Sequence, residues 1–194
     1  MKRRAWAPRL LAFLCLIQLC VPGFMIARRE HTLSRGRAFK FKTAPVDPYD
    51  AYRGRYVALG FEAARVKDVP PPPGSRPGDR VYALIGEDEK GFAKVTSLTS
   101  SRPEGGFYVR AIFREEFQKE TLLDLPFDRY YMEEEKAPLA EAAYRQHNWR
   151  EVADVYVVVR VSGSQAVIEE LFIQGMPIGD FLAKPPEKAQ KPAV

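Results

Sequence analysis

The sequence predicts an α+β protein, in which a mainly antiparallel β-sheet or a small barrel carries one packed helix and follows an N-terminal transmembrane helix. Three observations predict this class. Residues 10–27 form an uncharged apolar run, residues 38–176 contain short segments rich in β-branched and aromatic residues, and one Ala-rich segment lies late in the chain. Short turns separate most of the β segments, and strands joined by short turns pair antiparallel. A sheet with a helix packed on it is therefore the expected arrangement.

The apolar run at residues 10–27 has the length of a membrane-spanning helix. Its 18 residues carry no charge, and as a helix they extend about 27 Å, close to the thickness of the hydrocarbon core. A basic segment before an apolar run is also typical of a secretory signal, but small residues are wanted at both positions before the cleavage site. Ala27 has Met25 two residues before it. We therefore favour an uncleaved anchor, with a cleaved signal as the alternative.

The charge distribution bears on location and on partners. Residues 1–42 carry ten Lys or Arg and one Glu, a net charge of +9, whereas residues 43–194 have a net charge of −4. A mildly acidic domain argues against nucleic-acid binding, which needs a basic face. Four basic residues precede the apolar run and six follow it closely, so charge counting does not support an N-terminus inside the cell. The basic N-terminal tail is nevertheless typical of export, and we expect a single-pass protein of the bacterial inner membrane with a periplasmic domain.

Five parts are expected along the chain. They are a basic tail at 1–9, a transmembrane anchor or signal at 10–27, a juxtamembrane helix or linker at 28–37, a β-rich soluble domain at 38–180 and a disordered tail at 181–194. Both cysteines lie in the apolar run, so the domain has no disulfide, no cysteine nucleophile and no cysteine-based zinc site.

About seven strands, mostly linked as hairpins, are expected in the domain. Residues 55–62 place Val57, Leu59 and Phe61 on one side, which is the better core face. The Pro-rich residues 68–79 form a loop, because proline lacks the backbone donor of a central strand. The remaining predicted strands are 38–43, 81–85, 92–98, 107–115, 122–134, 152–163 and 165–176. A helix is predicted at 137–149, with a buried stripe made of Leu139, Ala142, Ala143 and Tyr144.

The sequence lacks the common catalytic patterns. Its only histidines are His31 and His147, and it has no phosphate-binding glycine motif and no serine-nucleophile motif. We therefore predict no catalytic residue, no metal site and no cofactor, and we do not expect an enzyme. A Ser–Lys pair remains conceivable between two lysines and three serines, namely Lys90 or Lys94 with Ser97, Ser100 or Ser101.

Residues 45–62, PVDPYDAYRGRYVALGFE, allow two interpretations. Asp47 and Asp50 favour a turn in which their side chains bond backbone N–H groups, and Gly54 permits a positive φ where the strand begins. This interpretation makes the stretch structural. The other makes it a recognition surface, because Tyr and Arg are common at interfaces. The candidate binding residues are Asp47, Asp50, Arg53, Arg55, Tyr56, Tyr130, Tyr131 and Glu133.

GRYVALGF within this stretch resembles the signature G-D-Y-x-x-L-x-Y of the GDYXXLXY family of bacterial membrane-anchored proteins. Gly54, Tyr56 and Leu59 match it, Phe61 replaces the last Tyr and Arg55 replaces the Asp. The resemblance continues through RREHTLSRGRAFKFKTAPVDPYDAYRG, VYALIGEDEKGFAKV and RYYMEEEKAPLAEA. It implies an N-terminal membrane segment, a β-rich domain outside the cytoplasm, no established activity and a complex with a multi-pass membrane protein. If the family's Asp does chemistry or binds a cation, Arg55 removes that role, which favours a structural one.

These observations favour a membrane-anchored envelope protein with a β-rich binding or assembly module. Its expected partners are the lipid bilayer, through residues 10–27, and a membrane or envelope protein. Two alternatives remain at this point. One is an envelope hydrolase or peptidase that uses a Ser–Lys or carboxylate site, and the other is a barrel that binds a small ligand in its interior.

Overall fold

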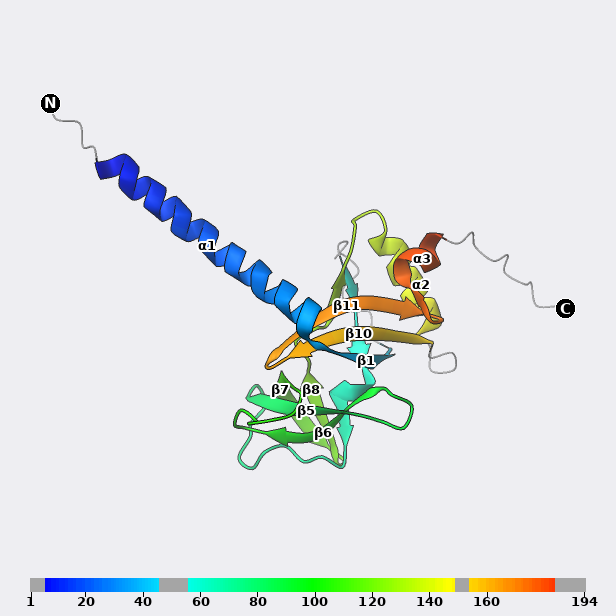
Figure 1. Ribbon diagram of the computed structural model, residues 1–194. Coiled ribbons are helices and arrows are strands. Elements are labelled where there is room, and N and C mark those ends of the chain that lie inside the picture. Colours follow the sequence, from blue (N-terminus) through cyan, green and yellow to red (C-terminus); the bar gives the residue numbers. More distant parts are fainter. Residues whose placement is uncertain (1–5, 46–55, 149–153, 184–194) are drawn as a thin grey trace.

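The computed structural model describes residues 6–45, 56–148 and 154–183. In these residues a long N-terminal helix leads into two five-stranded sheets, a two-stranded ribbon and two short helices (Figure 1). All pairs of adjacent strands in the sheets and the ribbon are antiparallel. The predicted α+β class with a mainly antiparallel sheet is therefore confirmed. The sheets do not close, so the alternative of a small barrel is wrong for the described part of the chain.

The first sheet has the order β12-β11-β10-β1-β3. Its central strand β10 (Val155–Ser162) alternates buried and half-buried residues, as period-two β-branched segments do when one face is covered. Phe39 and Phe41 of β1 lie opposite Val159 and Val157 of β10 and bury the same face. The other strands of this sheet are β1 (Arg37–Ala44), β3 (Gly60–Phe61), β11 (Gln165–Ile173) and β12 (Met176–Pro177).

The second sheet has the order β4-β8-β7-β5-β6, and the strands predicted at 81–85 and 92–98 pair in it as a hairpin. In the turn of that hairpin, Asp88 Oδ1 accepts hydrogen bonds from the backbone N–H groups of Phe92 at 2.8 Å and Lys90 at 2.9 Å. The Phe92 N–H is the main cause of a lowered pKa for Asp88. The strands are β4 (Arg65–Lys67), β5 (Arg80–Glu87), β6 (Ala93–Thr99), β7 (Tyr108–Phe117) and β8 (Glu120–Asp124), and the 3-10 helix η1 (Glu62–Ala64) precedes β4.

The two sheets share one hydrophobic core. It joins alternate residues of β1 and β10 to alternate residues of β5, β7 and β8, and Phe41 of the first sheet is fully buried within it. In Figure 1 the second sheet lies below the first, so the inner faces cover each other. Arg37 is the first residue of β1, and its Nη2 atom lies 3.1 Å from Glu87 Oε1 at the end of β5. This ion pair links the two sheets. The predicted core residues Val57, Leu59 and Phe61 are confirmed, since each is at most 5% exposed.

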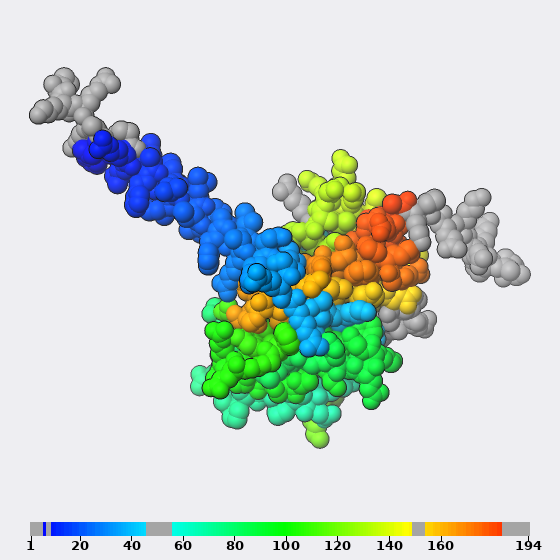
Figure 2. All heavy atoms as spheres, viewed as in Figure 1, coloured from blue at the N-terminus to red at the C-terminus, as the bar shows by residue number. Residues whose placement is uncertain are grey.

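Helix α1 (Trp6–Arg35) extends away from the domain and meets it only at its C-terminal end (Figure 2). Within the described residues, one helix, Arg9–Arg35, is long and apolar enough to cross a membrane, and none of its most apolar window is buried. It runs through the predicted anchor and most of the predicted juxtamembrane segment. A 30-residue helix is about 45 Å long, which exceeds the hydrocarbon thickness, so its last two turns can stand outside the bilayer.

The helices α2 (Ala137–His147) and α3 (Ile178–Ala183) lie together at the end of the first sheet away from α1 (Figure 1). The stripe predicted for α2 is largely wrong. Tyr144 is buried, but Leu139 is 61% exposed, Ala142 is exposed and Ala143 is only half-buried. The buried positions are Ala137, Ala140 and Tyr144, which lie on one helix face, and the small alanines let the helix approach closely. Helix α3 adds to the single predicted helix and extends to Ala183.

Candidate functional site

The β2–β9 ribbon brings together part of the predicted recognition surface. Strand β2 (Tyr56–Ala58) pairs with β9 (Arg129–Tyr131) in the register Tyr56↔Tyr131, Val57↔Tyr130 and Ala58↔Arg129. Residues directly opposite each other in a sheet share a face, and the face alternates along each strand. Tyr56, Tyr131 and Arg129 therefore lie on one face, while Val57 and Tyr130 lie on the other. We name Tyr56, Arg129 and Tyr131 the ribbon cluster.

The ribbon cluster is an aromatic and cationic surface. The rings of Tyr56 and Tyr131 are 5.6 Å apart between centroids, and Arg129 Cζ lies 5.1 Å from the centre of the Tyr56 ring. Tyr131 is 60% exposed. A hydrogen bond with Tyr131 is the main cause of a raised pKa for Arg129, and the Asp128 carboxylate adds to it. The cluster thus holds a cation against two rings, a combination that is frequent at protein interfaces.

Tyr130 and Glu133 have other roles in the structure. The Tyr130 hydroxyl donates a 2.7 Å hydrogen bond to Glu170 Oε1 of β11, which ties the ribbon to the first sheet. Burial, followed by that carboxylate, raises the pKa of Tyr130. Glu133 Oε2 lies 2.8 Å from Lys136 Nζ, and the Glu133 carbonyl accepts from the backbone at the start of α2. Both therefore serve the fold in these contacts. The other predicted residues, Asp47, Asp50, Arg53 and Arg55, lie outside the described residues.

The described part of the 45–62 stretch divides its residues between surface and core. Tyr56 belongs to the ribbon cluster, whereas Leu59 and Phe61 are 5% and 4% exposed. The backbone N–H of Leu59 donates to the Asp128 carbonyl at 2.9 Å, and β3 then leaves the ribbon to pair with β1. The stretch therefore crosses from the ribbon to the first sheet. Leu59 and Phe61, at the end of the signature, therefore have a structural role in this crossing.

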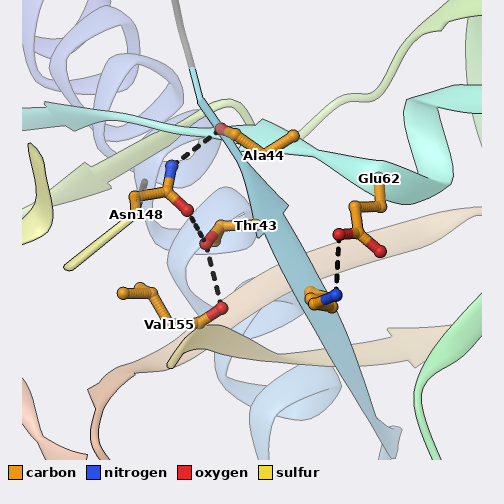
Figure 3. A network of polar contacts seen from close by, with 6 residues as sticks. Thr43, Ala44, Glu62, Asn148 and Val155 are labelled. Carbon is orange, nitrogen blue, oxygen red and sulfur yellow. Dashed lines mark hydrogen bonds and ion pairs between the residues drawn. The ribbon is translucent and has the colours of Figure 1, made fainter. Parts of the chain in front are cut away.

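A buried polar network supports this crossing (Figure 3). Thr43 Oγ1 lies 2.7 Å from Asn148 Oδ1 and 2.9 Å from the Val155 carbonyl, and Asn148 Nδ2 donates to the Ala44 carbonyl at 2.8 Å. Thr43 and Asn148 are 3% and 4% exposed. Sequence reasoning missed this network, because a lone Thr in a strand and a lone Asn after a helix carry no pattern. The Thr43 hydroxyl has one proton to donate to the two acceptors near it, and the Asn148 amide donates to the Ala44 carbonyl, so these contacts link β1, β10 and the end of α2.

Tyr144 of α2 completes the polar contacts around β1 and β3. Its hydroxyl lies 3.3 Å from the Ala44 carbonyl and accepts from the Gly60 N–H at 3.4 Å. Burial raises the pKa of Tyr144 to about 12. The hydroxyl therefore stays protonated at physiological pH and remains a donor to the Ala44 carbonyl.

An open cleft of about 610 Å³ lies between the two sheets, where β1, η1 and β4 face β6. Its charges are mixed. Lys42 Nζ lies 2.8 Å from Glu62 Oε1, and Lys67 Nζ lies 3.3 Å from Glu120 Oε1. Most of the acids in this cleft are thus neutralised by neighbouring lysines. Among the described residues there is no cluster of three His, Cys, Asp or Glu side chains that could hold a metal ion.

The Ser–Lys pair and the ligand-binding barrel are not supported by the part of the chain that the structure describes. No hydrogen bond joins Lys90 or Lys94 to Ser97, Ser100 or Ser101, and these serines are exposed on or after β6. A hydroxyl needs a base within hydrogen-bond reach to act as a nucleophile. The barrel alternative needs an enclosed interior, and the two open sheets do not provide one.

Comparison with known proteins agrees with the signature. No curated protein and no solved structure matches the chain. A family model described as GDYXXLXY protein matches residues 18–171, which include the second half of the apolar run, the second sheet, the ribbon and the first sheet except β12 and the end of β11. Because the match covers more than half of the sequence, the chain belongs to the GDYXXLXY protein family.

Proposed function

We propose that this protein is a single-pass, membrane-anchored binding or assembly module of the bacterial inner membrane. Its domain lies in the periplasm and contacts another membrane or envelope protein through the ribbon cluster and through Asp47, Asp50, Arg53 and Arg55, which precede Tyr56 in the sequence. The observation that carries the proposal is the exposed ring of Tyr131 beside Arg129 and Tyr56. Large aromatic side chains with an arginine in the same patch are typical hot spots of protein interfaces.

The place of the ribbon cluster favours a partner in the same membrane. Arg129 and Tyr131 line one groove together with Phe24 and Met25 from the last apolar turn of α1. The cluster therefore lies on the side of the domain that faces the bilayer, within reach of the outer loops of a neighbouring membrane protein. The resemblance to the family, which implies a complex with a multi-pass membrane protein, points the same way.

The test is co-purification of the full chain from native membranes in mild detergent. A Tyr131→Ala variant removes the exposed ring of the ribbon cluster, and Phe117→Ala is the matched control. Phe117 is 66% exposed and lies at the end of β7 in the second sheet. Both variants lose one exposed aromatic side chain. A difference in partner recovery between them therefore depends on where the ring lies and not on the loss of an aromatic ring as such.

We expect a membrane protein that co-purifies with the wild type and with Phe117→Ala to be lost with Tyr131→Ala. Loss of an interface hot spot costs about 2 kcal/mol or more, which corresponds to roughly a thirtyfold weaker complex. Equal recovery with Tyr131→Ala and wild type would remove the ribbon cluster from the interface. Absence of any partner from the wild-type preparation would overturn the assembly role.

A further inference from the structure

A groove of about 430 Å³ lies where α1 meets the domain, and its lining combines two chemistries. From α1 come Phe24, Met25, Arg28 and Arg29, and from β9 come Arg129 and Tyr131; the start of β11 closes the other side. Three of these side chains are guanidinium groups. No Asp or Glu lies among the described residues that line the groove. The groove is thus cationic, in contrast to the mixed cleft between the sheets.

The arginines of α1 are available for a ligand. Among the described residues no carboxylate forms an ion pair with Arg28 or Arg29. Arg129 has one carboxylate contact, and it is long, with 3.7 Å between its Nε and Asp128 Oδ1. Its other contacts, a hydrogen bond with Tyr131 and the ring of Tyr56, are uncharged and do not neutralise the guanidinium group. The guanidinium group presents paired donors that match a phosphate oxygen pair, and several such groups around one point form an anion site.

The apolar and cationic parts of the groove follow one another along the axis of α1. Phe24 and Arg28 are four residues apart, as are Met25 and Arg29, so each pair lies on one face of α1. Phe24 and Met25 are 67% and 66% exposed and lie in the last turn of the uncharged run, whereas the arginines begin the next turn. In a membrane-spanning helix the first arginines after the apolar run lie at the level of the lipid headgroups.

The joint between α1 and the domain fixes the groove in this position. Thr32, only 1% exposed, has its Oγ1 atom 3.1 Å from Gln165 Oε1 of β11. The Gly36 N–H donates to the Thr32 carbonyl at 2.8 Å, and Arg160 Nη1 donates to the Gly36 carbonyl at 3.2 Å. These contacts fix the position of β11, and of the groove wall that it forms with β9, relative to the apolar run of α1.

We propose that this groove binds one anionic phospholipid of the surrounding bilayer. The phosphate lies between Arg28, Arg29 and Arg129, and an acyl chain lies along Phe24 and Met25. A free phosphate would use only the cationic half of the groove. A phospholipid uses both halves, and the bilayer supplies it on either side of the membrane, so the site does not depend on which way the domain faces. The groove shares Arg129 and Tyr131 with the ribbon cluster, but lipid binding does not require the protein partner.

The experiment measures lipid retention by the purified full chain in non-ionic detergent, using native mass spectrometry. The probes are dioleoylphosphatidylglycerol, which is anionic, and dioleoylphosphatidylcholine, which carries the same acyl chains on a zwitterionic headgroup. Arg28→Gln with Arg29→Gln removes two cations from exposed helical positions. The control, Arg76→Gln with Arg80→Gln, removes the same charge from exposed positions that do not line the groove. Circular dichroism verifies that each variant is folded.

We expect the wild type and the control to retain the anionic lipid about a hundredfold better than the zwitterionic one, since each of the three arginines contributes roughly a factor of five. The Arg28, Arg29 variant loses most of this preference, and Arg129→Gln, which changes the domain side of the groove, reduces it about fivefold. Equal retention of both lipids by the wild type, or equal losses in variant and control, would overturn the proposal. So would displacement of the lipid by soluble glycerol phosphate at a similar concentration, because the acyl chains would then contribute nothing.

Discussion

Phe61 shows at the residue scale how one short stretch serves the core and the surface together. Its ring packs edge-on against Phe127 at 5.3 Å and Phe41 at 5.9 Å, and these two rings are 4.9 Å apart. The three aromatic rings come from β3, β1 and the segment between β8 and β9. They hold the ribbon against the first sheet, so that Tyr56, five residues earlier, is presented on the outer face.

Replacement of Phe61 by alanine should therefore lower the free energy of unfolding by about 3–5 kcal/mol, because it leaves a cavity among three rings. Phe117→Ala is the matched control. Its ring is 66% exposed, and we expect a change within about 0.5 kcal/mol. Denaturant unfolding of the full chain in detergent, followed by circular dichroism, measures both. Similar small losses in the two variants would mean that the aromatic group does not stabilise the crossing.

The side chains that the sequence predicts correctly are those with a local pattern. Alternation in 55–62 is enough to place Val57, Leu59 and Phe61 in the core, since the faces of a strand alternate whatever it pairs with. The pairing of Tyr56 with Tyr131 is not predictable in this way, because it depends on a register between distant segments. The Thr43 and Asn148 contact is equally non-local, as these residues are 105 positions apart.

At the scale of elements, the passage from α1 into β1 is the feature that joins the anchor to the domain. Gly36 stands at this passage, and an added Cβ there would meet the Thr32 carbonyl oxygen and would lie 3.2 Å from Arg160 Cβ. The helix and the β10–β11 hairpin come together because this position has no side chain. The short distance between the apolar run and the sheet follows from that contact.

Gly36→Ala should accordingly lower the free energy of unfolding by about 1–3 kcal/mol, as overpacking against backbone does. Gly179→Ala in α3 is the control, because an added Cβ at that position meets nothing within 4 Å and alanine favours the helix. Thermal unfolding of both variants as full chains distinguishes them. Equal stability of the Gly36→Ala and Gly179→Ala proteins would contradict this prediction, because it would mean that there is room for a Cβ between α1 and β10.

Elements differ in how far sequence predicts them. The long strands of the β5–β6 and β10–β11 hairpins are confirmed, because β5 and β10 alternate clearly and turn residues separate the strands of each pair. In α2 the extent was predictable but the buried face was not. The prediction placed Leu139 in the core because its side chain is large and apolar. In the structure the small residues Ala137 and Ala140 are buried instead. Helix α3 has six residues, too few for a helical period to be visible.

At the scale of the whole molecule, composition predicted the class but not the closure of the sheets. The separation of charge between residues 1–42 and 43–194 indicates an anchor and a domain. The structure has a protruding helix as far as Arg35 and a shared core that begins at Phe39, so the charge boundary falls within β1. Whether antiparallel strands form a barrel or two stacked sheets depends on which edges pair. Those edges, β3, β12, β4 and β6, are defined by long-range contacts that no local pattern encodes.

The side of the membrane on which the domain lies is the remaining property of the whole molecule, and the cysteine distribution makes it measurable. The native cysteines, Cys15 and Cys20, both lie in the apolar run. A full chain with both changed to serine and with Ser100→Cys carries one thiol, at an exposed position after β6. Because we propose a periplasmic domain, we expect a membrane-impermeant maleimide to label this variant in cells whose outer membrane alone is permeabilised.

Labelling in those cells should equal labelling after complete lysis, and the parent without Ser100→Cys gives the background. Labelling that requires lysis would place the domain in the cytoplasm and would make the six basic residues after the apolar run, rather than the four before it, the determinant of orientation. The interface proposed for the ribbon cluster would then need a partner with cytoplasmic loops. The lipid groove would bind a phospholipid of the cytoplasmic leaflet instead of the periplasmic one. The sidedness measurement thus separates the two proposals, since only the first depends on its outcome.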